Sequence, residues 1–156
     1  MTSPKVSELV KTGAKAPHFD LESYKDGVKG KVSLSDFAGK KNVILAFYPK
    51  DDTPGCTKEM CSFTEDSKLF EAAHTELLGI SCDTNESHEK FAQKHSLKHT
   101  LLADKGGNVG QAYGTVVEGK ATANRVAFVI DKAGIVRHVI EGMPKNSELL
   151  ELVKTL

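Results

Sequence analysis

Tryptophan is absent from this sequence, and cysteine, arginine and net charge are scarce. Three of the 156 residues are cysteine, and Arg125 and Arg137 are the two arginines among 21 basic residues. Acidic residues also number 21, so the formal net charge is zero. A neutral balance gives no excess of positive charge that would attract nucleic acid or an acidic membrane surface. Because lysine supplies nearly all of the positive charge, each arginine is unusual enough to suggest a specific use.

Long apolar runs are also missing. No stretch approaches the roughly 18–20 apolar residues that a membrane-spanning helix needs. The first residues, MTSPKVSELVKTGAKAP, lack the apolar core of a secretory signal and the arginine-rich pattern of a transit peptide. We therefore expect a cytoplasmic chain, or a mature chain from which a targeting segment was removed. An odd number of cysteines argues against a static disulfide scaffold, and Cys56 and Cys61, five residues apart, suggest metal binding or redox chemistry.

The apolar pattern predicts one domain, residues 1–156, in which strands and helices alternate. Asn42 to Tyr48 is a nearly continuous apolar run, typical of a strand covered on both faces. Pro49 ends it, and a loop from Lys50 to Gly55 leads into a helix expected from Cys56 to about His74. Further strands are expected at 77–81, 100–102, 125–131 and 135–140, with helices at 86–95, 108–113 and 146–156. Short peripheral strands are expected within 13–34 around a turn at 25–27, and a helical turn or a frayed tail at 1–12.

This order indicates a mixed sheet with helices on both faces, because the early alternation gives parallel strands and the late pair gives a hairpin. The thioredoxin-like fold is the α/β architecture that matches it. A flavodoxin-like sheet is the alternative, but that fold is wholly parallel and the closing hairpin disfavours it. Two helix caps are also predicted, by Thr84 or Asn85 before the helix at 86–95 and by Asn146 or Ser147 before the last helix.

Cys56 lies where a helix is expected to begin. In Thr53-Pro54-Gly55-Cys56, threonine is a good N-cap and proline is favoured at the first helical position. With Thr53 as the cap, Cys56 is the third helical residue, and its amide is one of the unpaired donors of the helix start. The partial positive charge there stabilises a thiolate over a thiol. A cysteine at such a place, beyond the end of a buried strand, is expected to be reactive rather than simply a packed apolar residue.

Cys61 and Cys82 allow several interpretations. In an ideal helix, residues five apart have Cα atoms roughly 8.6 Å apart, whereas a disulfide needs less than about 7 Å. Cys56 and Cys61 could therefore pair only if the first helical turns unwind, and in an intact helix Cys61 is a packed residue. A zinc site is a weak alternative because C-x₄-C lacks a second pair of ligands at zinc-like spacing. A Cys–His hydrolase also stays open, since none of the six histidines is adjacent in sequence but partners can meet in the fold. Cys82, just past a strand, is interpreted as structural.

The segment Pro49 to Cys56, PKDDTPGC, resembles the P-x-x-x-T-x-x-C signature of peroxiredoxins. The longer stretch FYPKDDTPGCTKEMCSF is similar to the branch of bacterioferritin comigratory protein, or peroxiredoxin Q. The likeness covers nearly the whole chain, through GAKAPHFDL, VSLSDFAGK, GISCDTNESHEKFAQKHSL and RVAFVIDKAGIV. Departures from the family pattern are few, and Met60 and Thr64 are the two expected to alter how easily the helix after Cys56 unwinds.

The resemblance implies a role for five residues. Cys56 corresponds to the peroxidatic cysteine, and Cys61 to the resolving cysteine of the atypical 2-Cys, peroxiredoxin Q type. Thr53 matches the hydroxyl that hydrogen-bonds the peroxide, and Pro49 the proline that shields the site from water. Arg125, just before a strand, matches the arginine that stabilises the thiolate and orients the peroxide.

The resemblance also implies a thiol-dependent peroxidase that reduces hydrogen peroxide and organic hydroperoxides, with no metal or organic cofactor. Cys56 becomes a sulfenic acid, Cys61 condenses with it to an intramolecular disulfide, and thioredoxin or a similar dithiol protein reduces that bond. A monomer is expected, with a dimer as the alternative. Two other functions stay open: a peroxide sensor that relays oxidation to a partner, and a thioredoxin-like disulfide reductase, although the latter favours a C-x-x-C motif that the sequence lacks.

Overall fold

Seven strands form one mixed sheet in the computed structural model, which describes residues 8–116, 120 and 122–156. The strands are β1 (Asp20–Lys25), β2 (Val28–Ser33), β3 (Asn42–Phe47), β4 (Thr75–Ser81), β5 (Thr100–Ala103), β6 (Val126–Ile130) and β7 (Val136–Glu141). The α-helices of the described residues are α1 (Pro54–Glu65), α2 (Ser67–Ala72), α3 (Asn85–His95), α4 (Asn108–Tyr113) and α5 (Asn146–Lys154), and a short 3₁₀ helix spans Leu34–Phe37.

The strand order is β2-β1-β5-β4-β3-β6-β7. Strands β3, β4 and β5 are parallel and form the centre, while β6 and β7 on one side and β1 and β2 on the other run antiparallel to their neighbours. The predicted mixed sheet and closing hairpin are therefore confirmed. The antiparallel placement of β6 directly beside β3 also separates this fold from a flavodoxin-like sheet.

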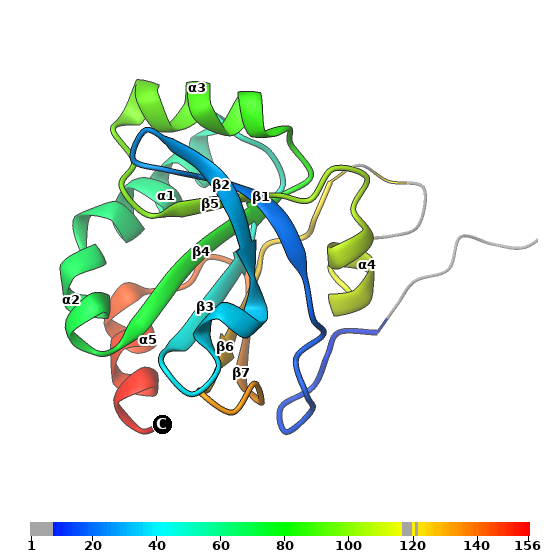
Figure 1. Cartoon of the computed structure of the whole chain (residues 1–156), viewed down its shortest axis with the longest axis vertical. Helices are drawn as coiled ribbons and strands as arrows, with labels where there is room; N and C mark the ends of the chain where they lie inside the picture. The colour runs from blue at the N-terminus through cyan, green and yellow to red at the C-terminus, as the bar shows by residue number, and fades with distance from the viewer. Residues whose placement is uncertain (1–7, 117–119, 121) are drawn as a thin grey trace, which may run out of the picture.

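Helices cover the two faces of the sheet unequally (Figure 1). Because successive side chains of a strand point to opposite faces, Ile44 and Ala46 of β3 join one core, and Val43 and Leu45 join the other. The first core receives side chains from α1, α2, α3 and α5, and the second from α4 and the segment before β1. All six residues of β3 are buried, as its continuous apolar run predicted.

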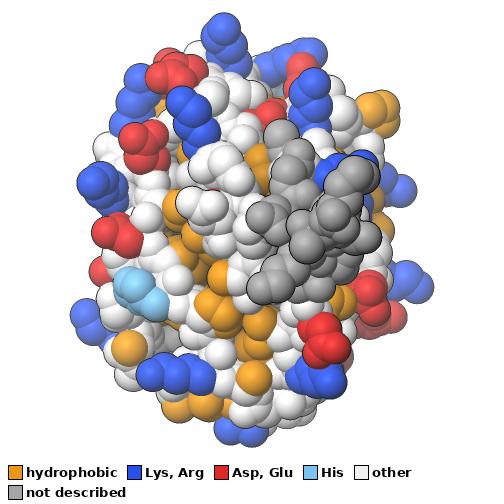
Figure 2. All heavy atoms as spheres, turned by 90° about the vertical axis from the view of Figure 1, so that its right-hand side faces the viewer, with side chains coloured by type: hydrophobic (Ala, Val, Ile, Leu, Met, Phe, Trp, Pro, Cys, Tyr) orange, Lys and Arg blue, Asp and Glu red, His pale blue; other side chains and the backbone are white. Residues whose placement is uncertain are grey.

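The surface of the face that carries α4 mixes charges of both signs. Figure 2 shows lysine and arginine side chains interspersed with aspartate and glutamate around its rim, and apolar side chains towards its middle. This distribution agrees with the balanced composition of the chain. Among the described residues, no helix is both long enough and apolar enough to cross a bilayer.

The single helix expected from Cys56 to His74 is wrong in two respects. It begins earlier, at Pro54, and it breaks at Asp66, which separates α1 from α2. Asp66 has φ −100° and ψ 9°, outside helical geometry, and its carboxylate accepts a hydrogen bond from the Asn146 side chain of α5. The apolar spacing continues through the break because both helices face the same core, so periodicity alone could not reveal it.

Of the caps predicted for α3 and α5, the first is confirmed and the second is wrong. Thr84 caps α3, because its hydroxyl accepts a hydrogen bond from the amide of Ser87. The cap predicted for α5 is wrong: Lys145 occupies the N-cap position, and Asn146 instead donates to Ser62 and Asp66 across the helix interface. The turn or tail expected at 1–12 lies partly outside the described residues, since residues 1–7 are not among them.

Candidate active site

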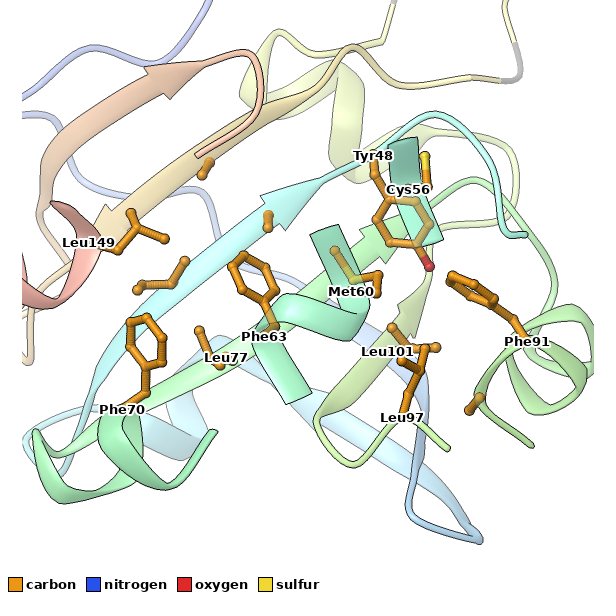
Figure 3. Packing of buried hydrophobic residues seen from close by; sticks show 14 of the residues in the cluster. Tyr48, Cys56, Met60, Phe63, Phe70, Leu77, Phe91, Leu97, Leu101 and Leu149 are labelled. Carbon is orange, nitrogen blue, oxygen red and sulfur yellow. The ribbon is translucent and has the colours of Figure 1, made fainter. Parts of the chain in front are cut away.

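The junction between β3 and α1 holds Cys56. Strand β3 ends at Phe47, and α1 begins at Pro54 with Thr53 in the N-cap position. Cys56 is therefore the third helical residue, as predicted from the sequence. Cys56 is fully buried, and Figure 3 shows it at the end of a row of α1 side chains that continues through Met60 and Phe63. The strand thus fixes where the helix starts, and the helix fixes the sulfur.

Arg125 reaches Cys56 because of the register between β3 and β6. Phe47, the last residue of β3, pairs with Val126, the first residue of β6. Arg125 therefore leaves β6 at the same edge of the sheet from which the loop to Cys56 departs. Its Nη2 donates a hydrogen bond to the Cys56 Sγ at 3.4 Å. Of the two arginines, the one singled out in the sequence is the one that meets the cysteine.

Glu59 is a site residue that the sequence reasoning missed. Its Oε1 accepts from Nη1 of Arg125 at 2.6 Å, and its side chain is only 2% exposed. Burial raises the pKa of Glu59 to about 7, against the opposing effect of Arg125. Glu59 follows Cys56 by three positions, and residues at that spacing share a helix face. That spacing was the signal available in the sequence.

The guanidinium of Arg125 therefore bridges two groups of α1. Burial lowers the pKa of Arg125, but its hydrogen bonds and charge interactions with Cys56 and Glu59 outweigh that effect and raise it overall. The arginine is held as a cation with one nitrogen directed at sulfur and the other at a carboxylate. A planar, forked cation suits this task in a way that a lysine ammonium does not.

Thr53 and Pro49 both lie in the loop, where the sequence placed them, and both are half-buried. The expected side-chain cap from Thr53 is absent: its hydroxyl instead donates to the carbonyl oxygen of Lys50 at 2.8 Å. The Thr53 carbonyl accepts the first helical hydrogen bond, from the amide of Thr57. The hydroxyl is thus held within the loop rather than at the helix amides.

Gly55 lets the arginine approach the helix start. A Cβ at Gly55 would lie 3.0 Å from Nη2 of Arg125 and 4.0 Å from the terminal methyl carbon of Met143. Any side chain larger than hydrogen would therefore push against the guanidinium that meets Cys56. Met143, in the loop after β7, is 43% exposed.

The other two cysteines differ in their surroundings. All three thiols are free, and Cys61 is half-buried in α1, packed against the first core. Burial, followed by the nearby Glu65, raises the pKa of Cys61. Burial, followed by Asp104 and then Asp83, raises the pKa of Cys82 to about 11. Cys82 packs with the second core, on the opposite face of the sheet from Cys56 and Cys61.

The fold and this site together define a class: a thioredoxin-like redox protein with a buried thiol at a helix start, faced by an arginine. A sequence model described as the AhpC/TSA family matches residues 12–139. The chain therefore belongs to the AhpC/TSA family and is a peroxiredoxin, a thiol-dependent peroxidase.

Individual relatives support this assignment along the whole chain. The Coxiella burnetii protein named "Putative peroxiredoxin bcp" is 40% identical over 153 residues, which is 94% of this chain and 99% of that protein. The chloroplastic peroxiredoxin Q of Sedum lineare is 40% identical over 152 residues, 94% of this chain and 80% of that protein. A reduced 2-Cys peroxiredoxin of Plasmodium vivax superposes with a TM-score of 0.86 at 30% identity, covering 91% of this chain and 79% of that one. The resemblance to the bcp and Q branch and the thioredoxin-like fold are therefore confirmed.

Proposed function

We propose that Cys56 is the peroxidatic cysteine of this peroxidase, with Arg125, Thr53 and Pro49 completing its site. The observation that carries the proposal is the contact between Nη2 of Arg125 and Sγ of Cys56 at a helix start. The cation and the helix terminus both favour negative charge on sulfur and on an oxygen bonded to it.

In the proposed first step, the Cys56 thiolate attacks one oxygen of a hydroperoxide in line with the O–O bond. The S–O bond forms, the O–O bond breaks, and the departing oxygen leaves as water or an alcohol after taking a proton. The sulfur is oxidised to a sulfenic acid and the peroxide is reduced. Arg125 stabilises the charge that develops on the two oxygens, and the Thr53 hydroxyl joins it by turning from the Lys50 carbonyl to the peroxide. Pro49 limits the access of water.

In the proposed second step, Cys61 attacks the sulfenic sulfur, and the hydroxyl leaves as water to give a Cys56–Cys61 disulfide. Both cysteines belong to the continuous helix α1, whose geometry keeps their Cα atoms too far apart for a bond. The helix start must therefore unwind before the disulfide closes. An external dithiol protein, which we propose to be thioredoxin, then restores both thiols by exchange.

The remaining proposals concern the setting of the reaction. We propose that residues 1–156 act as a single domain and as a monomer, with a dimer as the alternative. Three free thiols and a cycle that needs a dithiol reductant suit the reducing environment of the cytoplasm. Membership of the peroxiredoxins favours a catalytic peroxidase over a peroxide sensor.

Peroxide consumption coupled to thioredoxin and thioredoxin reductase tests the proposal. The wild-type protein should turn over hydrogen peroxide, and Cys56→Ser should lose that activity. Undiminished turnover in Cys56→Ser would sink the assignment. Failure to reduce insulin is expected in the same samples, because the C-x-x-C motif of a disulfide reductase is missing.

A matched pair of cysteine variants tests the resolving step. After one equivalent of peroxide, mass spectrometry should find the Cys56–Cys61 disulfide in wild type and in Cys82→Ser, but no intramolecular disulfide in Cys61→Ser. Cys61→Ser should then accumulate sulfinic acid at Cys56 as peroxide is added. An intramolecular disulfide in Cys61→Ser would identify Cys82 as the resolving residue instead.

A further inference from the structure

A buried hydrogen-bond network lies behind the loop that carries Thr53, and the reaction described above does not use it. Its centre is Asp51, whose Oδ1 accepts from the Tyr48 hydroxyl at 2.6 Å. Asp51 Oδ2 accepts from the Ser87 hydroxyl at 2.8 Å and faces Nδ1 of His88 at 2.7 Å. The side chain of His88 is fully buried and that of Asp51 is 4% exposed. These polar groups lie out of solvent, where an unpaired partner is costly.

The hydrogen-bond directions in this network are largely fixed by chemistry. Nε2 of His88 lies 2.8 Å from the carbonyl oxygen of Leu102, which can only accept, so Nε2 carries a proton. Burial, and then the charge of Asp51, raise the pKa of Tyr48 well above its usual value, so its hydroxyl remains a donor. One further proton lies between Nδ1 of His88 and Oδ2 of Asp51. Every polar atom of the imidazole therefore has a partner.

The network joins the loop to three elements at once. The Asp51 amide donates to Oδ2 of Asp83, just after β4, at 2.8 Å. His88 belongs to α3, and its Leu102 partner belongs to β5. The loop can therefore shift only if its bonds to Asp83 after β4 and to α3 break, while the bond of His88 to Leu102 fixes this part of α3 on β5.

The residue after Asp51 is also tied to α3. Asp52 has a φ of 59°, a conformation that is uncommon outside glycine. Its carboxylate accepts from Lys94 and pairs with Nε2 of His95, both at 2.8 Å. Thr53 follows directly, and its hydroxyl bonds back to the start of the same loop. Helix α3 thus holds the two residues that come immediately before Thr53.

We propose that His88, through its hydrogen bond to Asp51, is a positioning residue for peroxide reduction: it holds the loop so that Pro49 and Thr53 meet the peroxide at Cys56. This inference rests on the proposed role of Cys56. Two properties of the site are then independent: the placement of the peroxide and the formation of the thiolate. The hydrogen bond of Arg125 to the sulfur does not pass through this network, so His88 serves peroxide geometry and not thiolate formation.

A pair of amide variants tests the proposal. The side-chain nitrogen of asparagine occupies roughly the place of Nδ1, so His88→Asn keeps a donor towards Asp51 and loses the bond to Leu102. The side-chain nitrogen of glutamine occupies roughly the place of Nε2, so His88→Gln keeps the bond to Leu102 and loses the one to Asp51. Both variants remove the same ring from the same buried site, and the side chains that they leave there differ by one methylene group.

Two quantities are measured in each variant: the second-order rate constant for Cys56 oxidation by hydrogen peroxide, and the pH midpoint of thiolate formation from ultraviolet absorbance against Cys56→Ser. We expect His88→Gln to slow oxidation by about tenfold to about a hundredfold, as for a small misplacement of a reacting group, with the thiolate midpoint unchanged. His88→Asn should recover most of that rate. Equal slowing in both variants, or a thiolate midpoint that moves with the rate, would overturn the proposal.

Ser87→Ala provides a milder variant if the histidine variants fold poorly. It removes only the hydroxyl that donates to Asp51 Oδ2, while the capping of the Ser87 amide by Thr84 stays. Oxidation should slow by about threefold, since one hydrogen bond among several is lost. An unchanged rate in Ser87→Ala would contradict the proposal. Persistent peroxidase turnover in Cys56→Ser would instead contradict the proposed function, so the two failures are distinguishable.

Discussion

At the scale of single residues, the site depends on one cation shared between two partners. Arg125 donates to Cys56 with one nitrogen and to Glu59 with the other, and it stands at the edge where β6 begins. Cys56 and Glu59 come from one turn of α1, so the forked guanidinium spans a pair whose spacing the helix sets. Replacing Cys56 or Glu59 should therefore shift the Arg125 nitrogen that donates to the other of these two residues.

Replacing Arg125 by lysine should impair peroxide reduction strongly. A lysine ammonium is a single point of charge that cannot reproduce both bonds of the fork. We expect the rate constant for Cys56 oxidation to fall by about a hundredfold to a thousandfold, the usual cost of losing an oriented donor at a developing charge.

Arg137→Lys is the matched control for this substitution. Arg137 is the other arginine of the chain, is 52% exposed and pairs with Asp131 away from the site. Exposed ion pairs contribute little to stability. The rate constant for Cys56 oxidation in Arg137→Lys should therefore stay within about twofold of wild type. Similar losses in both variants would show that the effect does not come from the forked contact of Arg125 with Cys56 and Glu59.

Glu59 should make stability depend on pH. Its pKa is about 7 in the folded protein against an ordinary value of 4.5, so the folded state holds a proton that the unfolded state releases between those values. The stability that this proton contributes to the folded state is complete below about pH 4.5 and is lost as the pH rises through about 7. Glu59→Gln, which mimics the protonated form, should therefore gain stability relative to wild type as pH rises, by up to about 3 kcal/mol.

Urea unfolding at a series of pH values measures this difference, and Glu65→Gln is its control. Glu65 is an exposed glutamate at the end of the same helix. Because surface substitutions usually change stability little, Glu65→Gln should change the free energy of unfolding by no more than about 0.5 kcal/mol. A Glu59→Gln profile that runs parallel to wild type would show that Glu59 ionises as an ordinary carboxylate.

At the scale of elements, α1 has to be stable enough to place Cys56 and loose enough to release it. A buried cluster of Met60, Thr64 and His99 ties the helix to the start of β5. The Thr64 hydroxyl bonds Nδ1 of His99 at 2.9 Å and accepts from the Lys98 amide, and Nε2 of His99 meets the Met60 sulfur at 3.2 Å. Burial lowers the pKa of His99 to about 3, so the ring is neutral. Met60 and Thr64 are the two residues that the sequence led us to expect would alter how easily this helix unwinds.

Thr64→Val should speed the closing of the disulfide. The substitution keeps the shape of the side chain but leaves His99 and the Lys98 amide without their partner, which weakens the attachment of α1. If the attached helix loses about 1 kcal/mol of stability relative to the unwound one, disulfide formation after oxidation should accelerate about fivefold. A single turnover, quenched with acid and followed by mass spectrometry, measures the rate.

Thr64→Ser is the control, because serine retains the hydroxyl. Its disulfide should form at nearly the wild-type rate. Equal acceleration in Thr64→Ser and Thr64→Val would show that the hydrogen bonds of the hydroxyl do not control the rate, because serine retains that hydroxyl. No acceleration in Thr64→Val would mean that unwinding stops before the Thr64 turn.

At the scale of the whole molecule, the site stands on a buried sheet, and the part that we propose to unwind is one helix. Strands β3 and β6 are fully buried and have cores on both faces. Helix α1 packs on one of those faces, with its exposed residues towards solvent. Because central strands open only with global unfolding while peripheral elements open locally, the reaction cycle can disrupt α1 without disturbing the sheet.

Hydrogen exchange in the reduced and disulfide forms should show this division. Amides of the first turns of α1 should lose protection in the oxidised protein, while those of β3, β4 and β6 keep it. Mass-resolved exchange of proteolytic fragments measures both sets in one experiment. Loss of protection across the sheet would contradict a local opening, and unchanged protection of α1 would contradict a disulfide that requires unwinding.

Local chemistry in the sequence was enough to determine part of the site and most of the elements. Apolar period and turn residues located the strands, and the succession Thr53-Pro54-Gly55-Cys56 placed the cysteine at the third residue of a helix. These features depend on neighbours along the chain, where backbone geometry and propensity act directly. The role of Arg125 was predicted from the family resemblance, since nothing near it in sequence indicates a cysteine.

Only the tertiary structure decided which distant groups meet. The antiparallel register of β3 and β6 brings Arg125 to Cys56, and burial beside that arginine gives Glu59 its raised pKa. The break lies at Asp66, where the Asn146 side chain, 80 residues away in sequence, bonds the aspartate carboxylate. Contacts of this kind depend on register and on shared burial between segments far apart in the chain. Cys56 was therefore predictable as a residue at a helix start, whereas the charges and hydrogen bonds that surround it were decided by the fold.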